Sequence, residues 1–251
     1  MNEERFTGRA DRYAKYRPAY PQALFDYLTA EVGLTPGSVV ADIGAGTGIF
    51  TKQLLESGNA VLSVEPNDDM RKLLESALSG VPHHTSVNAT AENTGIQSAS
   101  VDFITAAQAF HWFDRPRFKA ECRRILKENG KVILVWNVRD DASALVRELF
   151  AVQQQYCPGF KGFAGGTSVA GAEDFSDFFE NGVCDCRVFQ NDLLFDEDSF
   201  IGRNLSSSYS LKETDKAYAA YVTAFRDIFA RYSKNGVLRM PQFTRSYAGA
   251  V

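Results

Sequence analysis

Apolar runs and helical periods alternate along the first 140 residues of the chain. Apolar segments typical of buried parallel strands are predicted at 38–43, 60–65, 100–113 and 131–137, and a more polar strand is predicted at 83–89. Segments with apolar residues at helical spacing lie between them, at about 47–57, 67–79 and 114–130. This alternation predicts a parallel sheet covered by helices.

Residues with special backbone preferences mark the predicted helix ends. Gly58 is expected to end the first of these helices in a left-handed conformation. Asn67 and Asp68 are candidates for the N-terminal cap of the next helix, and Gly130 is expected to end the helix that starts near 114.

The pattern weakens outside this region. A segment around Pro18 and Pro21 has helical spacing. After residue 140, helices are predicted at about 141–156, 173–181 and 214–235, and strands at 184–190 and 243–248. The glycine-rich stretch 159–174 is expected to be a flexible loop where a lid could begin.

Composition narrows the class of protein. The 251 residues are 45% hydrophobic and 23% charged, enough to bury the core of one α/β domain with a lid. A net charge of -4 and the lack of a basic patch argue against a nucleic-acid partner. No apolar run approaches the ~18 residues that span a bilayer, and the N-terminus lacks an apolar signal region. We therefore expect no membrane association and a cytoplasmic location.

No metal site is predicted. The four cysteines, Cys122, Cys157, Cys184 and Cys186, lack the spacing of zinc ligands and are interpreted as reduced and structural. The histidine pair at 83–84 has no cysteine or acidic partner at metal spacing.

The stretch "VVADIGAGTGIFT" runs from a predicted strand through three glycines into a predicted helix. Glycines at such a turn let a ligand approach the backbone, and the helix N-terminus presents free amides, as in nucleotide sites. The dinucleotide fingerprint G-x-G-x-x-G would place its third glycine where Ile49 stands. The match to NAD binding is therefore imperfect.

Two acidic residues make the pattern more specific. Asp42 precedes the loop and can brace both the loop and a ligand ammonium group. Glu65 closes the next strand and can accept hydrogen bonds from both hydroxyls of a ribose. Together they indicate a nucleoside ligand with a zwitterionic tail.

The ordered motifs "DIGAGTG", "VEP", "TAENTG", "AQAFHWFD" and "LKENGKVILVWN" resemble the class I S-adenosylmethionine-dependent methyltransferases, and within them the small-molecule methyltransferase type 11 group. The resemblance implies a doubly wound, Rossmann-like α/β fold of seven strands, with the last strand antiparallel and a helical cap. It implies one domain over 1–251, with the cofactor-binding core at 36–137. Cap and substrate-side elements are then expected at 1–35 and about 140–235.

The resemblance also assigns cofactor-binding residues. Those expected to contact S-adenosylmethionine are Asp42, Gly44, Ala45, Gly46, Gly48, Glu65, Pro66, Thr90, Ala91, Glu92 and Gln108. Glu65 would bind the ribose and Pro66 would lie under the adenine. Many relatives carry Asp where Thr90 stands, so the backbone amide of Ala91 is expected to contribute more to adenine binding here.

The acceptor side is expected to be aromatic. Phe110, Trp112 and Trp136 would place ring faces near the sulfonium, while Tyr13 and Arg17 would fold over the cofactor. His111 has two interpretations. It is either a general base toward the acceptor or a histidine hydrogen-bonded for structure.

Three functions follow from these patterns. The leading one is transfer of a methyl group from S-adenosylmethionine to a small-molecule acceptor by in-line displacement. An NAD-dependent oxidoreductase shares the glycine loop, but Ile49 and the absence of a Tyr-x-x-x-Lys pair after the fourth strand argue against it. A non-catalytic module that binds S-adenosylmethionine stays open.

Overall fold

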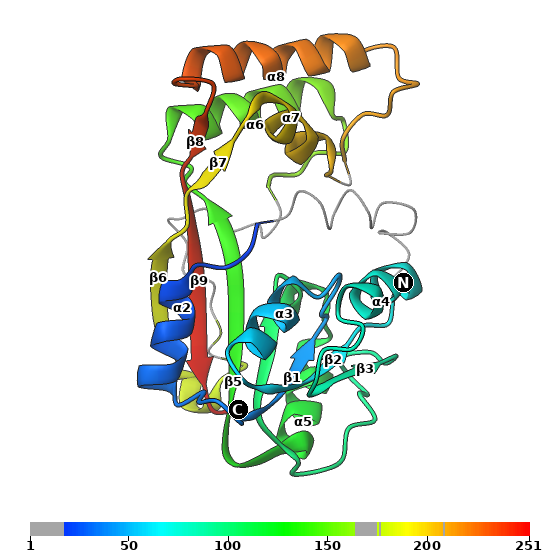
Figure 1. Ribbon diagram of the computed structural model, residues 1–251, viewed down its shortest axis with the longest axis vertical. Coiled ribbons are helices and arrows are strands. Elements are labelled where there is room, and N and C mark those ends of the chain that lie inside the picture. Colours follow the sequence, from blue (N-terminus) through cyan, green and yellow to red (C-terminus); the bar gives the residue numbers. More distant parts are fainter. Residues whose placement is uncertain (1–17, 164–174, 176, 208) are drawn as a thin grey trace.

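The computed structural model describes residues 18–163, 175, 177–207 and 209–251. Its central element is a seven-stranded sheet in the order β3-β2-β1-β4-β5-β9-β6 (Figure 1). The strands are β1 Val39–Ile43, β2 Ala60–Val64, β3 His84–Val87, β4 Val101–Ala107, β5 Leu126–Arg139, β6 Asp185–Gln190 and β9 Gln242–Gly249. Strands β1 to β5 pair in parallel, and β9 is antiparallel to both β5 and β6. The predicted seven-stranded fold with an antiparallel last strand is confirmed.

Three helices alternate with the first five strands: α3 Ile49–Glu56, α4 Asp68–Ala77 and α5 Arg115–Ile125. The predicted cap of α4 is confirmed, because the Asn67 side chain accepts a hydrogen bond from the Met70 N–H at 3.0 Å. Gly58 follows α3 at φ +85, the left-handed conformation expected of it.

The sheet is buried on both faces because successive side chains of a strand point to opposite sides. In β1, Val40 packs with Phe50 of α3 on one face. Ile43 packs on the other face with Phe118 of α5. Helix α2 (Gln22–Tyr27) and the π-helical turn Leu28–Val32 belong to the first of these clusters. Residues 20–34 thus cover the sheet itself.

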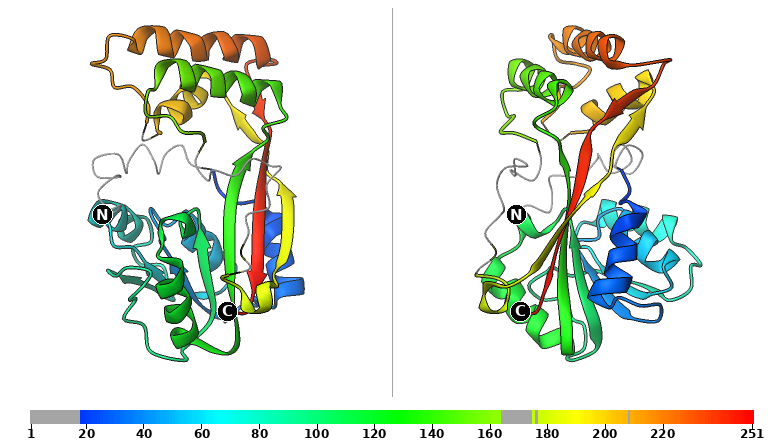
Figure 2. Two further views of the ribbon diagram at one scale, coloured as in Figure 1. Left: turned by 180° about the vertical axis from the view of Figure 1, so that it is seen from behind. Right: turned by 90° about the vertical axis from the view of Figure 1, so that its left-hand side faces the viewer.

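A smaller layer stands beyond the carboxyl ends of the strands. It contains helices α6 Ala144–Tyr156, α7 Glu197–Leu205 and α8 Tyr218–Tyr232, with the hairpin β7 Leu193–Phe195 and β8 Leu238–Met240. Strands β5 and β9 run from the sheet toward this layer, which has its own apolar cluster around Phe200, Tyr221 and Phe225 (Figure 2). We call this layer the cap.

The predicted boundaries around the fourth and fifth strands are wrong. The fourth strand ends at Ala107 rather than 113, because Gln108 has φ +59 and Phe110–Trp112 forms one 3-10 turn. An unbroken apolar run does not distinguish a strand from a short buried helix. The helix expected to reach Gly130 ends at Ile125, where Leu126 becomes extended and pairs with Val101.

Beyond residue 140 the sequence predicted the structure in part. Helices α6 and α8 and strands β6 and β9 match their predicted positions, whereas α7, β7 and β8 were not predicted. The helix expected at 173–181 is wrong over its described residues, where a 3-10 turn at Glu180–Gly182 occurs instead. Residues 164–174 of the expected flexible loop lie outside the described residues.

Candidate functional site

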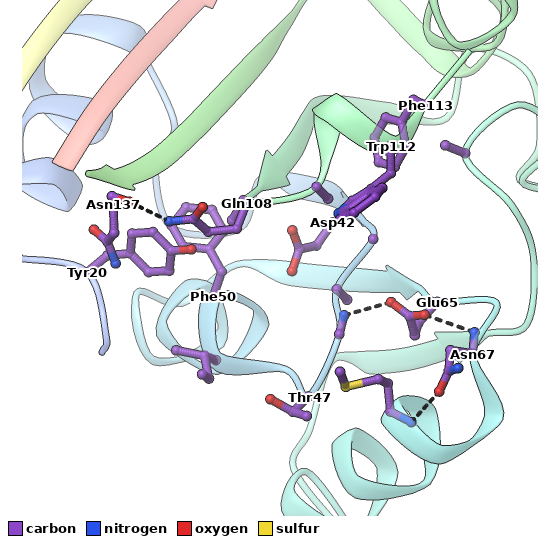
Figure 3. A pocket seen from close by; sticks show the side chains of 18 of the residues that line it. Tyr20, Asp42, Thr47, Phe50, Glu65, Asn67, Gln108, Trp112, Phe113 and Asn137 are labelled. Carbon is purple, nitrogen blue, oxygen red and sulfur yellow. Dashed lines mark hydrogen bonds between the residues drawn. The ribbon is translucent and has the colours of Figure 1, made fainter. Parts of the chain in front are cut away.

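A pocket of about 390 Å³ opens at the carboxyl ends of β1, β2 and β4 (Figure 3). This is the crevice where open α/β sheets bind their ligands. Its walls include every predicted cofactor residue except Gly48, namely Asp42, Gly44, Ala45, Gly46, Glu65, Pro66, Thr90, Ala91, Glu92 and Gln108. Residues far apart in the sequence are thus brought to one cavity.

The three glycines of the loop after β1, Gly44, Gly46 and Gly48, all have positive φ, but their surroundings differ. A Cβ on Gly44 would stand 2.5 Å from the Cβ of Ala109, and one on Gly48 would stand 2.9 Å from Leu74 Cγ. Both glycines therefore allow close packing. A Cβ on Gly46 would meet nothing within 4 Å, so only this glycine presents its backbone to open space.

Glu65 is held at the end of β2 by two backbone donors. Its Oε2 accepts a hydrogen bond from the Gly46 N–H and its Oε1 from the Asn67 N–H, each at 2.9 Å (Figure 3). The carboxylate thereby joins the glycine loop to the start of α4. A carboxylate can accept about four hydrogen bonds, and Glu65 lies in the wall of the pocket.

Asp42 lies under the same loop and is 1% exposed. Its two carboxylate oxygens accept hydrogen bonds from Thr51 Oγ1 at 2.6 Å and Thr105 Oγ1 at 2.8 Å. Burial raises the pKa of Asp42 to about 6, against the opposing effect of the two threonine hydroxyls. The residue ties β1 to α3 and β4.

Another part of the pocket lining is apolar. Pro66, Met70 and Ala91 line it beside Thr90 and Glu92. The Glu92 side chain accepts a hydrogen bond from the Asp114 N–H at 2.9 Å, which anchors this loop to the start of α5.

Gln108 closes the end of β4 in a left-handed conformation. Its side-chain Nε2 donates to the Asn137 carbonyl at 3.0 Å, and its N–H donates to the Val135 carbonyl at 2.8 Å (Figure 3). Tyr20 and Phe50 line the pocket nearby, with ring centroids 4.8 Å apart in an edge-to-face contact. The motifs had not indicated Tyr20, Phe50 or Asn137 as site residues.

The expected aromatic residues separate into two groups. Trp112 lines the pocket, as does its neighbour Phe113. Phe110 and Trp136 do not, since both are buried in an aromatic cluster below the pocket, where their ring centroids lie 6.2 Å apart. The 3-10 turn turns Phe110 toward the core while Trp112 stays at the cavity.

His111 is not among the described residues that line the pocket. The residue is exposed, and desolvation lowers the pKa of its ring to about 4. Tyr13 and Arg17 lie outside the described residues.

The remaining wall is lined by Arg139 at the end of β5, Gln242 at the start of β9, Arg203 on α7 of the cap, and Phe163. The sequence had not indicated these residues. Arg139 could have been found, because it follows the fifth apolar run directly. Arg203 and Gln242 had no local signal. The helix that carries Arg203 was not predicted, and Gln242 lies just before the strand predicted at 243–248.

Residues 41–134 match a protein family described as a methyltransferase domain. An uncharacterized methyltransferase of Mycobacterium tuberculosis is 38% identical over 144 residues, which cover 57% of this chain and 56% of that protein. An uncharacterized methyltransferase-like protein of Schizosaccharomyces pombe is 32% identical over 145 residues. The match spans 56% of its length as well.

Solved structures extend the likeness to the whole fold. A protein described as a type II methyltransferase, from Anaeromyxobacter dehalogenans, superposes with a TM-score of 0.66 at 25% identity over 94% of this chain and 98% of that chain. A phosphoethanolamine N-methyltransferase of Haemonchus contortus, in complex with S-adenosyl-L-methionine, shares the fold at 17% identity with a TM-score of 0.54, covering 97% of this chain and 56% of that chain.

The sheet order and the pocket at its carboxyl edge define a Rossmann-like methyltransferase fold. The matched domain, the relatives and the solved structures support the class I S-adenosylmethionine-dependent methyltransferase superfamily. S-adenosylmethionine is the cofactor of this superfamily. Within the described residues, no helix is long and apolar enough to cross a membrane.

Proposed function

We propose that this protein transfers a methyl group from S-adenosylmethionine to a small-molecule acceptor. The observation that carries the proposal is the Glu65 carboxylate, fixed by the Gly46 N–H at the wall of the pocket. A carboxylate at the end of the second strand suits a ribose, and the open space at Gly46 suits a ligand that approaches the backbone.

The described lining residues fit the cofactor in size and chemistry. The cavity of about 390 Å³ falls in the range of small-molecule sites, roughly 300 to 1,000 Å³. Asp42 and Glu65 suit the ammonium and ribose hydroxyl groups of the cofactor. The apolar wall of Pro66, Met70 and Ala91 suits a flat adenine ring.

When bound, S-adenosylmethionine supplies a methyl group on a positively charged sulfur. The sulfur–carbon bond breaks with its electron pair left on sulfur, while a lone pair of the acceptor forms the new bond. An acceptor atom that carries a proton releases it. The contribution of this chain is to align the two reactants. Alignment alone can lower a barrier by about 7 to 11 kcal/mol. Tyr20, Phe50 and Trp112 exclude water and offer ring faces to a cation, each worth roughly 0.5 to 2 kcal/mol.

The cap supports the assignment of a small acceptor. Arg139, Phe163 and Arg203 wall off the end of the pocket that the predicted cofactor residues do not line. The net charge of -4 also disfavours a nucleic acid.

The test is calorimetric titration with S-adenosylmethionine and S-adenosylhomocysteine, with NADH and NADPH as comparison ligands. We expect micromolar binding of the adenosyl ligands alone, about -8 kcal/mol. Binding of NADH alone would instead support an oxidoreductase. Binding without transfer of labelled methyl to any compound of a broad metabolite pool would support a non-catalytic module.

A matched pair of glycine variants tests the position of the cofactor. Gly46→Val fills the open space at the loop, so we expect at least a hundredfold loss of affinity for S-adenosylhomocysteine. Gly80→Val is the control, because Gly80 also has a positive φ with nothing within 4 Å and does not line the pocket. Equal affinities in the two folded variants would contradict the proposed site.

A further inference from the structure

The cap end of the pocket is built on paired residues of β5 and β9. Arg139 lies directly opposite Gln242 in the antiparallel register, so both side chains leave the sheet on the same face. Both line the pocket. Asn137, two residues before Arg139 and on the same face, lines it as well.

Among the described residues, none accepts a hydrogen bond from the side-chain amide of Gln242. The residue is 2% exposed, and within the described part of the chain its side-chain Nε2 has no hydrogen-bond partner. A buried donor of this kind is costly unless a bound molecule accepts its hydrogen bond. Its place in the pocket wall points to a ligand as that acceptor.

Two guanidinium groups lie at the same end. The Arg139 guanidinium carbon stands 3.9 Å from the centroid of the Phe163 ring, and this stacking fixes the plane of its donors. Arg203 projects from α7 and is 6% exposed, so its charge lies in a desolvated wall. Arginine in such a setting binds carboxylate and phosphate groups with paired hydrogen bonds.

The two signs of charge are separated along the pocket. The acidic residues among the described lining are Asp42 on β1, Glu65 after β2 and Glu92 after β3. These strands lie on one side of β4 in the sheet, whereas β5 and β9 lie on the other. The acidic end suits the cofactor, and the basic end suits an anion.

We propose that the methyl acceptor is a small organic acid, whose carboxylate or phosphate group is bound by Arg139 and Arg203 with the Gln242 amide as a further donor. The inference rests on the proposed function and adds the substrate class to it. The bound anionic group acts as an anchor that orients the acceptor toward the cofactor end of the pocket.

The test measures binding of defined probes to the protein saturated with S-adenosylhomocysteine. Phenylacetate and succinate carry carboxylates, phenyl phosphate carries a phosphate, and phenylacetamide matches phenylacetate in size without its charge. We expect at least one anion to bind in calorimetry and phenylacetamide to bind at least tenfold more weakly than the anion that binds best. The phosphate and carboxylate probes distinguish the two anionic groups.

Three variants assign the anion to this end of the pocket. Arg139→Met and Arg203→Met keep an unbranched apolar stem and remove the charge, and Gln242→Glu opposes an anion with a like charge. Each is expected to weaken binding of the best anion at least tenfold while affinity for S-adenosylhomocysteine changes less than threefold. The matched control is Arg245→Met, because Arg245 is 7% exposed on β9 and does not line the pocket.

Every other outcome overturns the inference. If the wild type binds S-adenosylhomocysteine but none of the three anions up to 10 mM, or binds phenylacetamide as tightly as the best anion, the acceptor is not an acid held at this site. If the arginine variants lose S-adenosylhomocysteine affinity instead, these arginines hold the cofactor. Failure of the wild type to bind S-adenosylhomocysteine would contradict the proposed function itself.

Discussion

The Glu65 carboxylate accepts a hydrogen bond from the backbone N–H of Gly46 at 2.9 Å and so connects the end of β2 to the loop that follows β1. The same carboxylate accepts a second bond from the Asn67 N–H. One side chain therefore fixes both loops on either side of the proposed ribose position.

Replacement of Glu65 tests whether it binds ligand as well as holding these loops. Glu65→Gln keeps the shape of the side chain but removes its charge and turns an amide toward the backbone donors. Hydrogen bonds to the charged carboxylate, worth about 1.5 to 3 kcal/mol each, are thereby weakened. We expect S-adenosylhomocysteine affinity in calorimetry to fall about 10- to 100-fold. Glu56→Gln, at an exposed position of α3, is the control. Unchanged affinity in a folded Glu65→Gln protein would limit Glu65 to a structural role.

Gly44→Ala is expected to lower stability through a collision rather than through backbone conformation alone. The added Cβ would stand 2.5 Å from Ala109 Cβ at a position with φ +69. Gly37→Ala is the matched variant, since Gly37 has φ +88 with nothing within 4 Å and bears only the left-handed cost of about 1 to 2 kcal/mol. Urea denaturation should show Gly44→Ala at least about 1 kcal/mol less stable than Gly37→Ala. Equal losses of stability in the two variants would mean that the loop containing Gly44 shifts to avoid the collision.

The raised pKa of Asp42 predicts a pH-dependent stability. With a pKa of about 6 in the folded state and 3.8 in the unfolded state, the folded protein binds the proton more tightly. The wild type therefore loses stability as the pH rises from about 4 to 6, by up to about 3 kcal/mol. Asp42→Asn cannot ionise and should lack this loss. The measurement is urea denaturation of both proteins between pH 4 and 7, and parallel curves would contradict the shifted pKa.

His111→Asn is expected to leave catalysis nearly intact. The ring is not among the described pocket-lining residues, and its pKa of about 4 keeps it neutral on both sides of pH 6.5. Once an acceptor is known, kcat/KM should change less than about threefold, with the same pH profile between pH 5.5 and 8. A steep fall in kcat at unchanged cofactor affinity would identify His111 as the general base.

Local patterns were sufficient for the cofactor half of the fold. Strands β1, β2 and β4 are short apolar runs, β5 contains one, and Gly58 and Asn67 mark helix ends by their own backbone and side-chain chemistry. These signals act over a few residues, so they are readable without knowledge of the fold. The stretch after Ala107 was misread for the same reason, because an apolar run there suits both a strand and a buried turn.

The pocket required more than local patterns. Phe110 and Trp112 lie two residues apart in one aromatic stretch, yet the first packs in the core and the second lines the cavity. That division depends on the 3-10 turn, which follows from how the end of β4 packs against α5.

The sequence by itself determined the class of fold, the glycine loop and the carboxylate at the end of β2, because each depends on residues close together in the chain. Only the tertiary structure decided the cap end of the pocket. Arg139, Arg203 and Gln242 come from separate elements, and they meet because β9 returns antiparallel beside β5 and carries its partner residues to the cavity. Such a meeting is set by strand register and helix packing over long sequence distances, and neither leaves a pattern in the local sequence.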